Sequence, residues 1–405
     1  MRVALLSIVR PSDCGSGGYR GFIEFAGRSV ARRQLDLALA LGCERIVFVT
    51  DYLHQPLLAL QHICETAGAR FNTVSGARAL SGLIKANDEL LVLADSLVPL
   101  SDKARQRLDK GPCVLTLPCE EGIAAGFERI DLNSAWAGAL LMPGHAVERL
   151  SDLPSDCDVP ASLLRIALQV RVPEVSLGSN VLSYGDWLLL SSPAQAEKLE
   201  ATWLRRHVPT STGRAPGHAI AGWFLSTFAV SLARRSKAGV QMLWLAFALM
   251  LIAAGVGGWV WLPLGLVFIA LAYLALKVAS GLAAVEAATG SGQPASSRWE
   301  MAETWLLDFV LSGLLAAGIF IPESGWAEAG LSALVLAAAL RVLAGLAPAE
   351  WRGLAEDRFT FSVILSAAAF GSILALAVHV LTLCALAAGL YFLARISQKQ
   401  EITRL

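Results

Sequence analysis

A glycine-rich segment near the N-terminus is the first part of the sequence that could do chemistry. The segment RPSDCGSGGYRG (residues 10–21) follows the apolar run VALLSIV (residues 3–9) and precedes a region with helical periodicity. The backbone N–H groups of such a loop, placed between a strand and a helix, often bind nucleotide phosphates. We therefore expect Gly15, Gly17 and Gly18 to bind a nucleotide. The alternative is a tight turn that binds nothing.

A second set of chemically active residues lies in the apolar half of the chain. Lys277 ends one apolar segment, and Glu300, Glu303 and Asp308 begin the next. At 100° per residue, these three acids share an arc of about 140° on one helix. Ionisable groups inside a membrane span are costly, so they are usually functional or paired. We expect Asp308 to lie deepest and to pair with Lys277 on the neighbouring helix.

The elements that must position the glycine loop alternate between strands and helices. Hydrophobic patterning predicts strands at residues 3–9, 45–50, 70–74 and 89–96, and helices at residues 30–41 and 55–67. This alternation is typical of a doubly wound α/β domain, with a parallel sheet covered by helices on both faces. Ligands of such sheets bind at the carboxyl ends of the strands. The glycine loop and Asp95 are therefore expected at the same edge.

The second half of the chain predicts an all-α domain with six membrane spans. The segments are residues 239–256, 259–276, 302–321, 327–346, 361–377 and 380–394, most of them near the 17 to 25 residues that a span needs. The last two come from one apolar run, which we divide near Val378 and His379. Lys and Arg flank alternate connections, and Arg341, Arg352 and Arg358 are assigned to the flanks of the loop after the fourth span. The N-terminal domain and the C-terminus are therefore predicted to be cytoplasmic at the inner membrane.

Residues 215–235 join the two halves. Their apolar part is short and a basic cluster closes it, which predicts an interfacial helix on the cytoplasmic leaflet. A seventh span is the alternative, and it would place the first half on the opposite side from the C-terminus. The expected domains are residues 1–206, a linker with the interfacial helix at residues 207–237, and residues 238–397.

Composition argues against several other classes of protein. The chain has 33 Lys and Arg against 33 Asp and Glu, and no basic block is interleaved with aromatic residues, so nucleic acid is not an expected partner. The seven cysteines form no CxxC pair and are predicted to be reduced thiols. The N-terminal apolar stretch is too short for a signal peptide. We expect the first half to remain in the cytoplasm.

The first half resembles the sugar-phosphate and polyol-phosphate nucleotidyltransferases. The segments that carry the resemblance are FIEFAGRSVARRQLDLALALGCERIVFVTD (residues 22–51), LLVLADSLV (residues 90–98), WAGALLMPGHAVERL (residues 136–150) and GDWLLLSSPAQAEKLEATWL (residues 185–204). The resemblance implies that the glycine loop binds a triphosphate, that Asp95 holds Mg²⁺, and that Arg20 takes the place of a family lysine.

The same resemblance implies a second metal-binding carboxylate, but this sequence has no acidic residue at the expected positions. The positions expected to carry it hold Leu189, Ser191, Ser192 and Pro193. Asp13 and Asp186 are the nearest carboxylates that could substitute. With one aspartate of the pair missing, the site should hold Mg²⁺ poorly. The structural alternative for Asp95 is an exposed turn residue at the end of a strand.

The second half resembles the CDP-alcohol phosphatidyltransferases. Its six predicted spans, the preceding interfacial helix and the segment AEDRFTFSVILSAAAFG (residues 355–371) carry this resemblance, and fusions of a cytidylyltransferase to this membrane fold are known. The family's aspartates and arginine would fall on Lys277, Ser280 and Val285. A lysine would repel the metal ion that an aspartate should bind, so phosphatidyltransferase activity is not expected. The family is commonly dimeric, which implies a homodimer.

Three functions fit these observations. The first is a membrane-anchored nucleotidyltransferase that activates a polyol or sugar phosphate with a nucleotide such as CTP for phospholipid head-group synthesis, using Arg20, Asp95 and Mg²⁺. The second is a catalytically degenerate scaffold or partner subunit of a membrane lipid-synthesis enzyme. The third is a membrane domain that binds or moves a lipid near Lys277 and Asp308.

Overall fold

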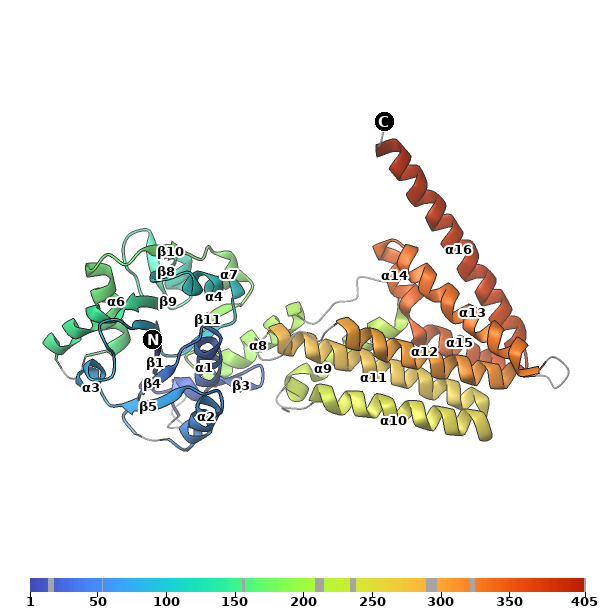
Figure 1. The fold of residues 1–405 in the computed structure, drawn as a ribbon, viewed down its shortest axis with the longest axis horizontal. Helices are drawn as coiled ribbons and strands as arrows, with labels where there is room; N and C mark the ends of the chain where they lie inside the picture. The colour runs from blue at the N-terminus through green and yellow to red at the C-terminus, as the bar shows by residue number, and fades with distance from the viewer. Residues whose placement is uncertain are drawn as a thin grey trace. The chain divides into compact units, whose positions relative to one another are not determined.

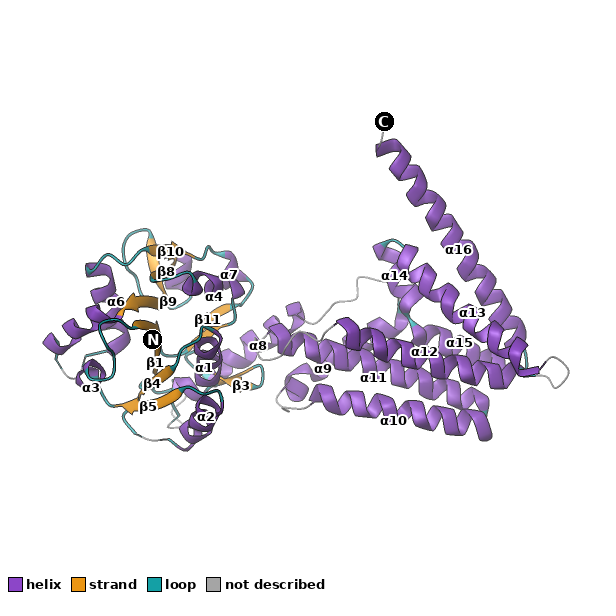
Figure 2. Cartoon of the chain, in the orientation of Figure 1, coloured by secondary structure: helices purple, strands orange, loops and turns teal. Residues whose placement is uncertain are grey.

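The computed structural model describes residues 1–13, 18–52, 54–154, 157–207, 215–233, 238–288, 297–320 and 325–403. The chain forms two compact units that divide near Arg205. The N-terminal unit combines strands and helices, and the second unit is built from helices (Figures 1 and 2). The two units are described separately below.

A seven-stranded sheet organises the N-terminal unit. Its strand order is β10-β8-β9-β6-β1-β4-β5. The strands are β1 (Arg2–Ser7), β4 (Arg45–Val49), β5 (Arg70–Val74), β6 (Glu89–Leu93), β8 (Cys113–Pro118), β9 (Ser134–Pro143) and β10 (Glu174–Ser176). Strand β1 pairs in parallel with both β4 and β6, and β4 pairs in parallel with β5. Only β9 runs antiparallel to its neighbours within this sheet.

Helices cover both faces of the sheet because its strands are apolar on both faces. Along β1, Ala4 and Leu6 belong to one buried cluster, whereas Val3 and Leu5 belong to the other. The first cluster includes residues of α1 (Val30–Ala40), α2 (Gln55–Thr66) and α4 (Asp102–Asp109). The second includes residues of α3 (Ala77–Ser81), the 3-10 helix η2 (Gly144–Asp152) and α6 (Val159–Gln169). Such two-sided burial explains why the central strands read as continuous apolar runs.

The remaining elements of this unit are short or lie at its end. They are the 3-10 helix η1 (Arg20–Phe22), β2 (Glu24–Phe25), β3 (Arg28–Ser29), β7 (Leu97–Pro99), α5 (Cys119–Ala124), α7 (Asn180–Ser183), β11 (Trp187–Leu189) and α8 (Pro193–His207). Strands β7 and β11 pair antiparallel, which ties the segment after β6 to the end of the unit. The α/β prediction for the first half is confirmed, with one antiparallel strand inside the parallel-dominated sheet.

The second unit contains eight described helices. They are α9 (Pro216–Ala233), α10 (Ala238–Trp259), α11 (Leu262–Ala288), α12 (Ser297–Ile319), α13 (Gly325–Leu346), α14 (Ala349–Glu356), α15 (Arg358–Phe370) and α16 (Leu374–Thr403). Five segments among the described residues are long and apolar enough to cross a membrane: Ala238–Trp259, Leu262–Ala287, Ala302–Ile319, Gly325–Leu346 and Leu374–Arg395. These five helices fit a membrane-embedded second half.

The six-span prediction is not confirmed, and its last boundary is wrong. Val378 and His379, where we expected a break, lie inside the continuous helix α16. The chain instead breaks at Gly371 and Ser372, and Ser372 has a φ of 57°, a left-handed conformation that no helix continues through. The helix before this break has only 13 residues, about 20 Å at 1.5 Å per residue, which is short of a hydrocarbon core of about 30 Å.

Residues 215–235 are largely helical, as predicted. Helix α9 covers Pro216–Ala233 and is not among the five candidate spans. Its first turn is held inside the helical unit, because the N–H of Gly217 donates to the buried carboxylate of Asp357 at 2.8 Å. The position of α9 relative to a bilayer stays a prediction.

Candidate functional site

A pocket of about 570 Å³ lies at the carboxyl ends of the parallel strands in the N-terminal unit. Residues at or after the ends of β1, β4, β5 and β6 line it, among them Val9, Asp51, Ser75 and Asp95. The segment from the end of α5 into β9, the start of α6 and the segment from β11 to α8 complete the wall. Ligands of open α/β sheets bind at this edge, and the volume is in the usual range of small-molecule sites. The sheet therefore places a ligand-sized pocket where the sequence predicted one.

Asp95 is a buried carboxylate in this pocket and not the exposed turn residue of the alternative interpretation. It is only 8% exposed. Its Oδ2 accepts hydrogen bonds from the backbone N–H groups of Val9 at 3.1 Å and Arg10 at 2.7 Å. Its Oδ1 is buried and has no hydrogen-bond partner among the described residues. Burial raises the pKa of Asp95, whereas these N–H donors and the charges of Arg10 and Arg20 act to lower it.

The turn that carries Asp95 is held from three sides. The side-chain amide of Gln34, on α1, donates to the carbonyls of Ala94 and Leu97 at 2.9 Å each. Ser96 has a φ of 68°, a conformation rare for a residue with a side chain and often found at functional sites. A Cβ at Gly138 would lie 3.3 Å from that of Ala94. The turn is therefore fixed by tertiary contacts that no short motif reveals.

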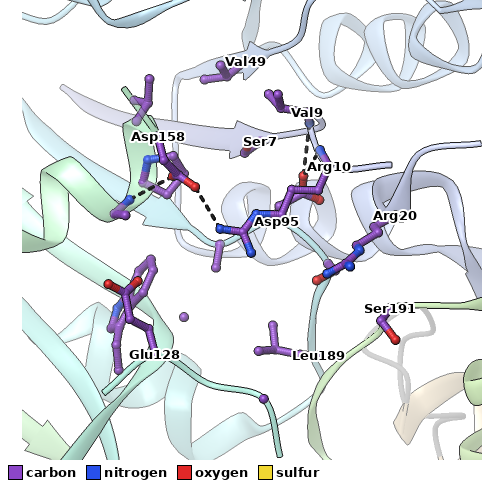
Figure 3. A pocket seen from close by; sticks show the side chains of 18 of the residues that line it. Ser7, Val9, Arg10, Arg20, Val49, Asp95, Glu128, Asp158, Leu189 and Ser191 are labelled. Carbon is purple, nitrogen blue, oxygen red and sulfur yellow. Dashed lines mark hydrogen bonds and ion pairs between the residues drawn. The ribbon is translucent and has the colours of Figure 1, made fainter. Parts of the chain in front are cut away.

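Arg10 places a guanidinium across the pocket. Figure 3 shows its side chain extending toward Asp158, with Arg20 and Ser191 on the other side. Arg10 Nη2 donates to Asp158 Oδ2 at 2.8 Å, and this bond raises the pKa of Arg10. Asp158 also caps α6, because its Oδ1 accepts from the N–H of Ala161 at 3.2 Å. The Arg10 and Asp158 side chains are 57% and 44% exposed, so the pair is weak and a ligand can compete for it.

Arg20 also lines the pocket, at the base of the predicted phosphate loop. Its Nη2 donates to Asp13 Oδ1 at 2.6 Å and its Nε to the Pro11 carbonyl at 3.1 Å. The ion pair lowers the pKa of Asp13. The loop closes on itself through the N–H of Ser12, which donates to the Gly18 carbonyl at 2.7 Å. The two other predicted nucleotide-binding glycines, Gly15 and Gly17, lie outside the described residues.

Neither Asp13 nor Asp186 completes a two-carboxylate magnesium site with Asp95. Asp95 offers one oxygen, since the other already accepts two N–H groups. Asp13 binds Arg20, and Asp186 accepts from the Trp203 indole at 3.3 Å; neither lines the pocket. Within the described ranges, no group of three His, Cys, Asp or Glu residues could share a metal ion. The expected loss of the second carboxylate is therefore not compensated by Asp13 or Asp186.

Sequence reasoning missed four of the charged residues that line the pocket: Arg10, Asp51, Glu128 and Asp158. Arg10 was quoted only as the start of the loop, although a cation directly after a buried strand lies at the ligand edge by topology alone. Asp158 comes from a distant part of the chain, where Asp-Val-Pro marks the start of a helix. Its place beside Arg10 follows only from the packing of α6 against the sheet.

Asp308 in the helical unit binds arginines that we had assigned to a loop. Its carboxylate accepts from Arg341 Nε at 2.7 Å and from Arg358 Nε at 2.7 Å and Nη2 at 3.2 Å. The expected salt bridge to Lys277 is thus replaced by a pair of arginines, because α13 and the start of α15 pack closer to Asp308. Lys277 and Glu303 line a separate cavity with Arg341 and Arg358. The side chain of Glu300 is outside the described part of α12.

Comparison with known proteins gives likenesses to solved structures only. No family model matches the chain, and no curated protein matches it. A glucose-1-phosphate thymidylyltransferase from Bacillus anthracis, in complex with sucrose, is 12% identical over 50% of this chain and 94% of its own, with a TM-score of 0.38. A UDP-glucose pyrophosphorylase complexed with UDP-glucose is 10% identical over 51% of this chain and 99% of its own, with a TM-score of 0.36.

A UDP-glucose pyrophosphorylase from Acinetobacter baumanii is 10% identical over 52% of this chain and 95% of its own, with a TM-score of 0.35. These three structural neighbours are sugar-phosphate nucleotidyltransferases, and each covers about half of this chain. The three comparisons do not show the resemblance of the second half to the CDP-alcohol phosphatidyltransferases.

Proposed function

We propose that the chain is a membrane-anchored, nucleotidyltransferase-like protein whose N-terminal unit binds a nucleotide or a sugar nucleotide in the Asp95 pocket. One observation carries the proposal. Two guanidinium groups, those of Arg10 and Arg20, line a pocket at the carboxyl edge of the sheet together with the buried carboxylate of Asp95. The wall also carries three exposed carboxylates, those of Asp51, Glu128 and Asp158. Guanidinium groups match the geometry of phosphate oxygens, and they bind phosphates through charge-assisted hydrogen bonds.

The exposed ion pair between Arg10 and Asp158 suits a reversible ligand. Exposed pairs of this kind stabilise a protein by about 0–1 kcal/mol. A hydrogen bond between a charged donor and a phosphate contributes about 1.5–3 kcal/mol. A phosphate group can therefore replace Asp158 as the partner of Arg10. Asp158 would remain in place, because it also caps α6.

Asp95 gives the proposed site its selectivity for a hydroxylated ligand. A buried acceptor without a partner is costly, and ribose or hexose hydroxyl groups are donors that could satisfy its Oδ1. The two backbone N–H groups that bind Oδ2 hold the carboxylate still. A ligand with both a phosphate and a sugar would thus satisfy the arginines and Asp95 together.

Ligand titration against the purified full-length protein in detergent tests this proposal. CTP, UDP-glucose and a phosphorylated polyol are added separately, and binding is measured by calorimetry. Arg10→Ala and Arg20→Ala should each weaken binding by about 10-fold or more, since each removes a charge-assisted hydrogen bond. Arg105→Ala is the matched control, because Arg105 forms a surface ion pair with Asp102 on α4. Absence of binding by all three ligands would refute the proposal.

A second candidate function is nucleotidyl transfer itself, for activation of a polyol or sugar phosphate in phospholipid head-group synthesis. The observation that favours it is the Asp95 carboxylate in the pocket wall, whose Oδ1 is not already used by a hydrogen bond among the described residues. Release of pyrophosphate from CTP in the presence of Mg²⁺, lost in Asp95→Ala, would support it. Nucleotide binding without pyrophosphate release would instead favour a catalytically degenerate scaffold over an active nucleotidyltransferase.

A further inference from the structure

The helical unit contains its own cavity, of about 820 Å³, lined by residues of α11 to α15. It lies where the C-terminal parts of α11 and α13 meet the N-terminal part of α12 beside α14, an end of the unit that can be followed in Figure 1. Four cationic side chains line it, against two carboxylates: Lys277, Arg341, Arg352 and Arg358, with Glu303 and Glu356. The remainder of the wall is mostly apolar.

Arg341 is held in a fixed position in this cavity. Its Nε donates to Asp308 Oδ2 at 2.7 Å, and its guanidinium carbon lies 3.7 Å from the centre of the Trp305 ring. Its Nη2, however, is buried and has no hydrogen-bond partner among the described residues. A buried donor without a partner is rare and costly, and this nitrogen is closed off from the cavity. The Arg341 side chain as a whole is 26% exposed and lines the cavity. Its guanidinium, fixed by Asp308 and Trp305, is thus positioned to donate to a ligand.

Arg358 has a different role, since its guanidinium is used within the protein. It donates to Asp308 from Nε and Nη2 and to the Ala355 carbonyl from Nη1. Asp308 therefore neutralises part of the charge of two arginines and fixes both. Arg352 is exposed at the cavity and contributes a further positive charge.

We propose that this cavity binds the phosphate group of an anionic ligand through the guanidinium groups of Arg341 and Arg352. Arg341 lies five residues before the end of α13, about 7–8 Å along the helix axis, which is a suitable depth for a lipid head group at the end of a span. Leu276, Leu307 and Ala344 line the same cavity and could contact a glycerol or acyl portion. The site needs no protein-bound metal, because the cations face the anion directly. It is independent of nucleotide binding by the N-terminal unit.

The test uses the full-length protein in detergent with three probes: dioctanoyl phosphatidic acid, dioctanoylglycerol and inorganic phosphate. Binding is followed by the fluorescence of the tryptophans, which include Trp305 beside Arg341. We expect phosphatidic acid to bind and dioctanoylglycerol not to bind. Saturable binding of inorganic phosphate alone would support the same anion site and identify a free phosphate compound as its occupant. Equal binding of phosphatidic acid and dioctanoylglycerol would overturn the proposal.

Two variants separate the ligand contact from folding. Arg341→Lys keeps a cation beside Asp308 but removes the planar guanidinium, and it should weaken phosphate binding about 10-fold while the protein remains folded. Arg352→Ala removes an exposed cation outside the Asp308 cluster and should weaken binding several-fold. Arg395→Ala, an exposed arginine of α16 outside the cavity, is the control. Unchanged affinity in both Arg341→Lys and Arg352→Ala would refute the proposal.

Discussion

Asp95→Asn should make the N-terminal unit more stable while it weakens ligand binding. The asparagine amide oxygen can accept the N–H groups of Val9 and Arg10, which bind Oδ2 at 3.1 and 2.7 Å. The change removes the buried charge, whose other oxygen has no hydrogen-bond partner among the described residues. Such an acceptor costs about 1–3 kcal/mol. Because the amide leaves a neutral donor in its place, we expect a gain near the lower limit, about 1 kcal/mol.

The pH dependence of this gain has a definite sign. Burial raises the pKa of Asp95 in the folded protein, so the folded state binds a proton more tightly than the unfolded state does. The stability of the wild type relative to Asp95→Asn should then fall as the pH rises from about 4, the unfolded value, through the raised pKa. Above the raised pKa the difference should be constant, and below about pH 4 it should be smallest.

Hydrogen exchange of the full-length protein measures the effect locally, at β1 and β6. A gain of 1 kcal/mol corresponds to roughly 5-fold slower exchange. Asp51→Asn is the matched control, because Asp51 is an exposed carboxylate lining the same pocket, and it should change stability by less than about 0.5 kcal/mol. Faster exchange in Asp95→Asn at neutral pH, or a difference that grows toward low pH, would refute this reasoning.

Three substitutions test the contacts that shape the two units. Asp308→Asn should lower the free energy of unfolding by about 3–5 kcal/mol, because two arginines lose their charge partner. Denaturation in detergent measures this free energy, and a loss below about 1 kcal/mol would contradict the assigned pairing. Gly217→Ala should cost about 1–3 kcal/mol, measured by thermal unfolding, because a Cβ there would collide with Asp357; an unchanged melting temperature would exclude that close approach. Gly138→Ala should destabilise the N-terminal unit by a similar amount, since the φ of Gly138 is 79°. It should also weaken nucleotide binding, because Gly138 packs against the turn that carries Asp95. Wild-type affinity by calorimetry would mean that this turn does not position Asp95.

The elements of the N-terminal unit could be predicted closely from the sequence. Predicted strands at residues 45–50 and 70–74 correspond to β4 (Arg45–Val49) and β5 (Arg70–Val74). For β4 the reason is that a strand buried on both faces produces an unbroken apolar run. β5 lies at the edge of the sheet, and only Val74 of its five residues is buried. The same patterning placed Asp95 at the ligand edge. It gave no indication that β9 enters the sheet antiparallel, since strand direction depends on the path of the connecting segments.

Hydrophobicity was a less complete guide in the helical unit. It identified the apolar segments, but the end of α15 depends on the left-handed residue Ser372, and composition does not reveal a single backbone conformation. Likewise, charge counting assigned Arg341 and Arg358 to the positive flank of a loop, whereas packing turns both toward Asp308. Which charged side chains meet depends on the rotation of each helix about its own axis, and that rotation is set by how the helices pack together.

The sequence by itself determined the division into an α/β half and an apolar half, the position of Asp95 at the ligand edge, and the absence of a carboxylate at the segment LLLSSP (residues 188–193). These properties depend on periodicity and residue type, which are local. The tertiary structure decided that Asp95 is buried, with one oxygen that has no hydrogen-bond partner among the described residues, and that Arg10 meets Asp158. It also decided that Arg341 binds Asp308 in the wall of a cavity. Burial and pairing arise when distant segments pack, so no local pattern can encode them.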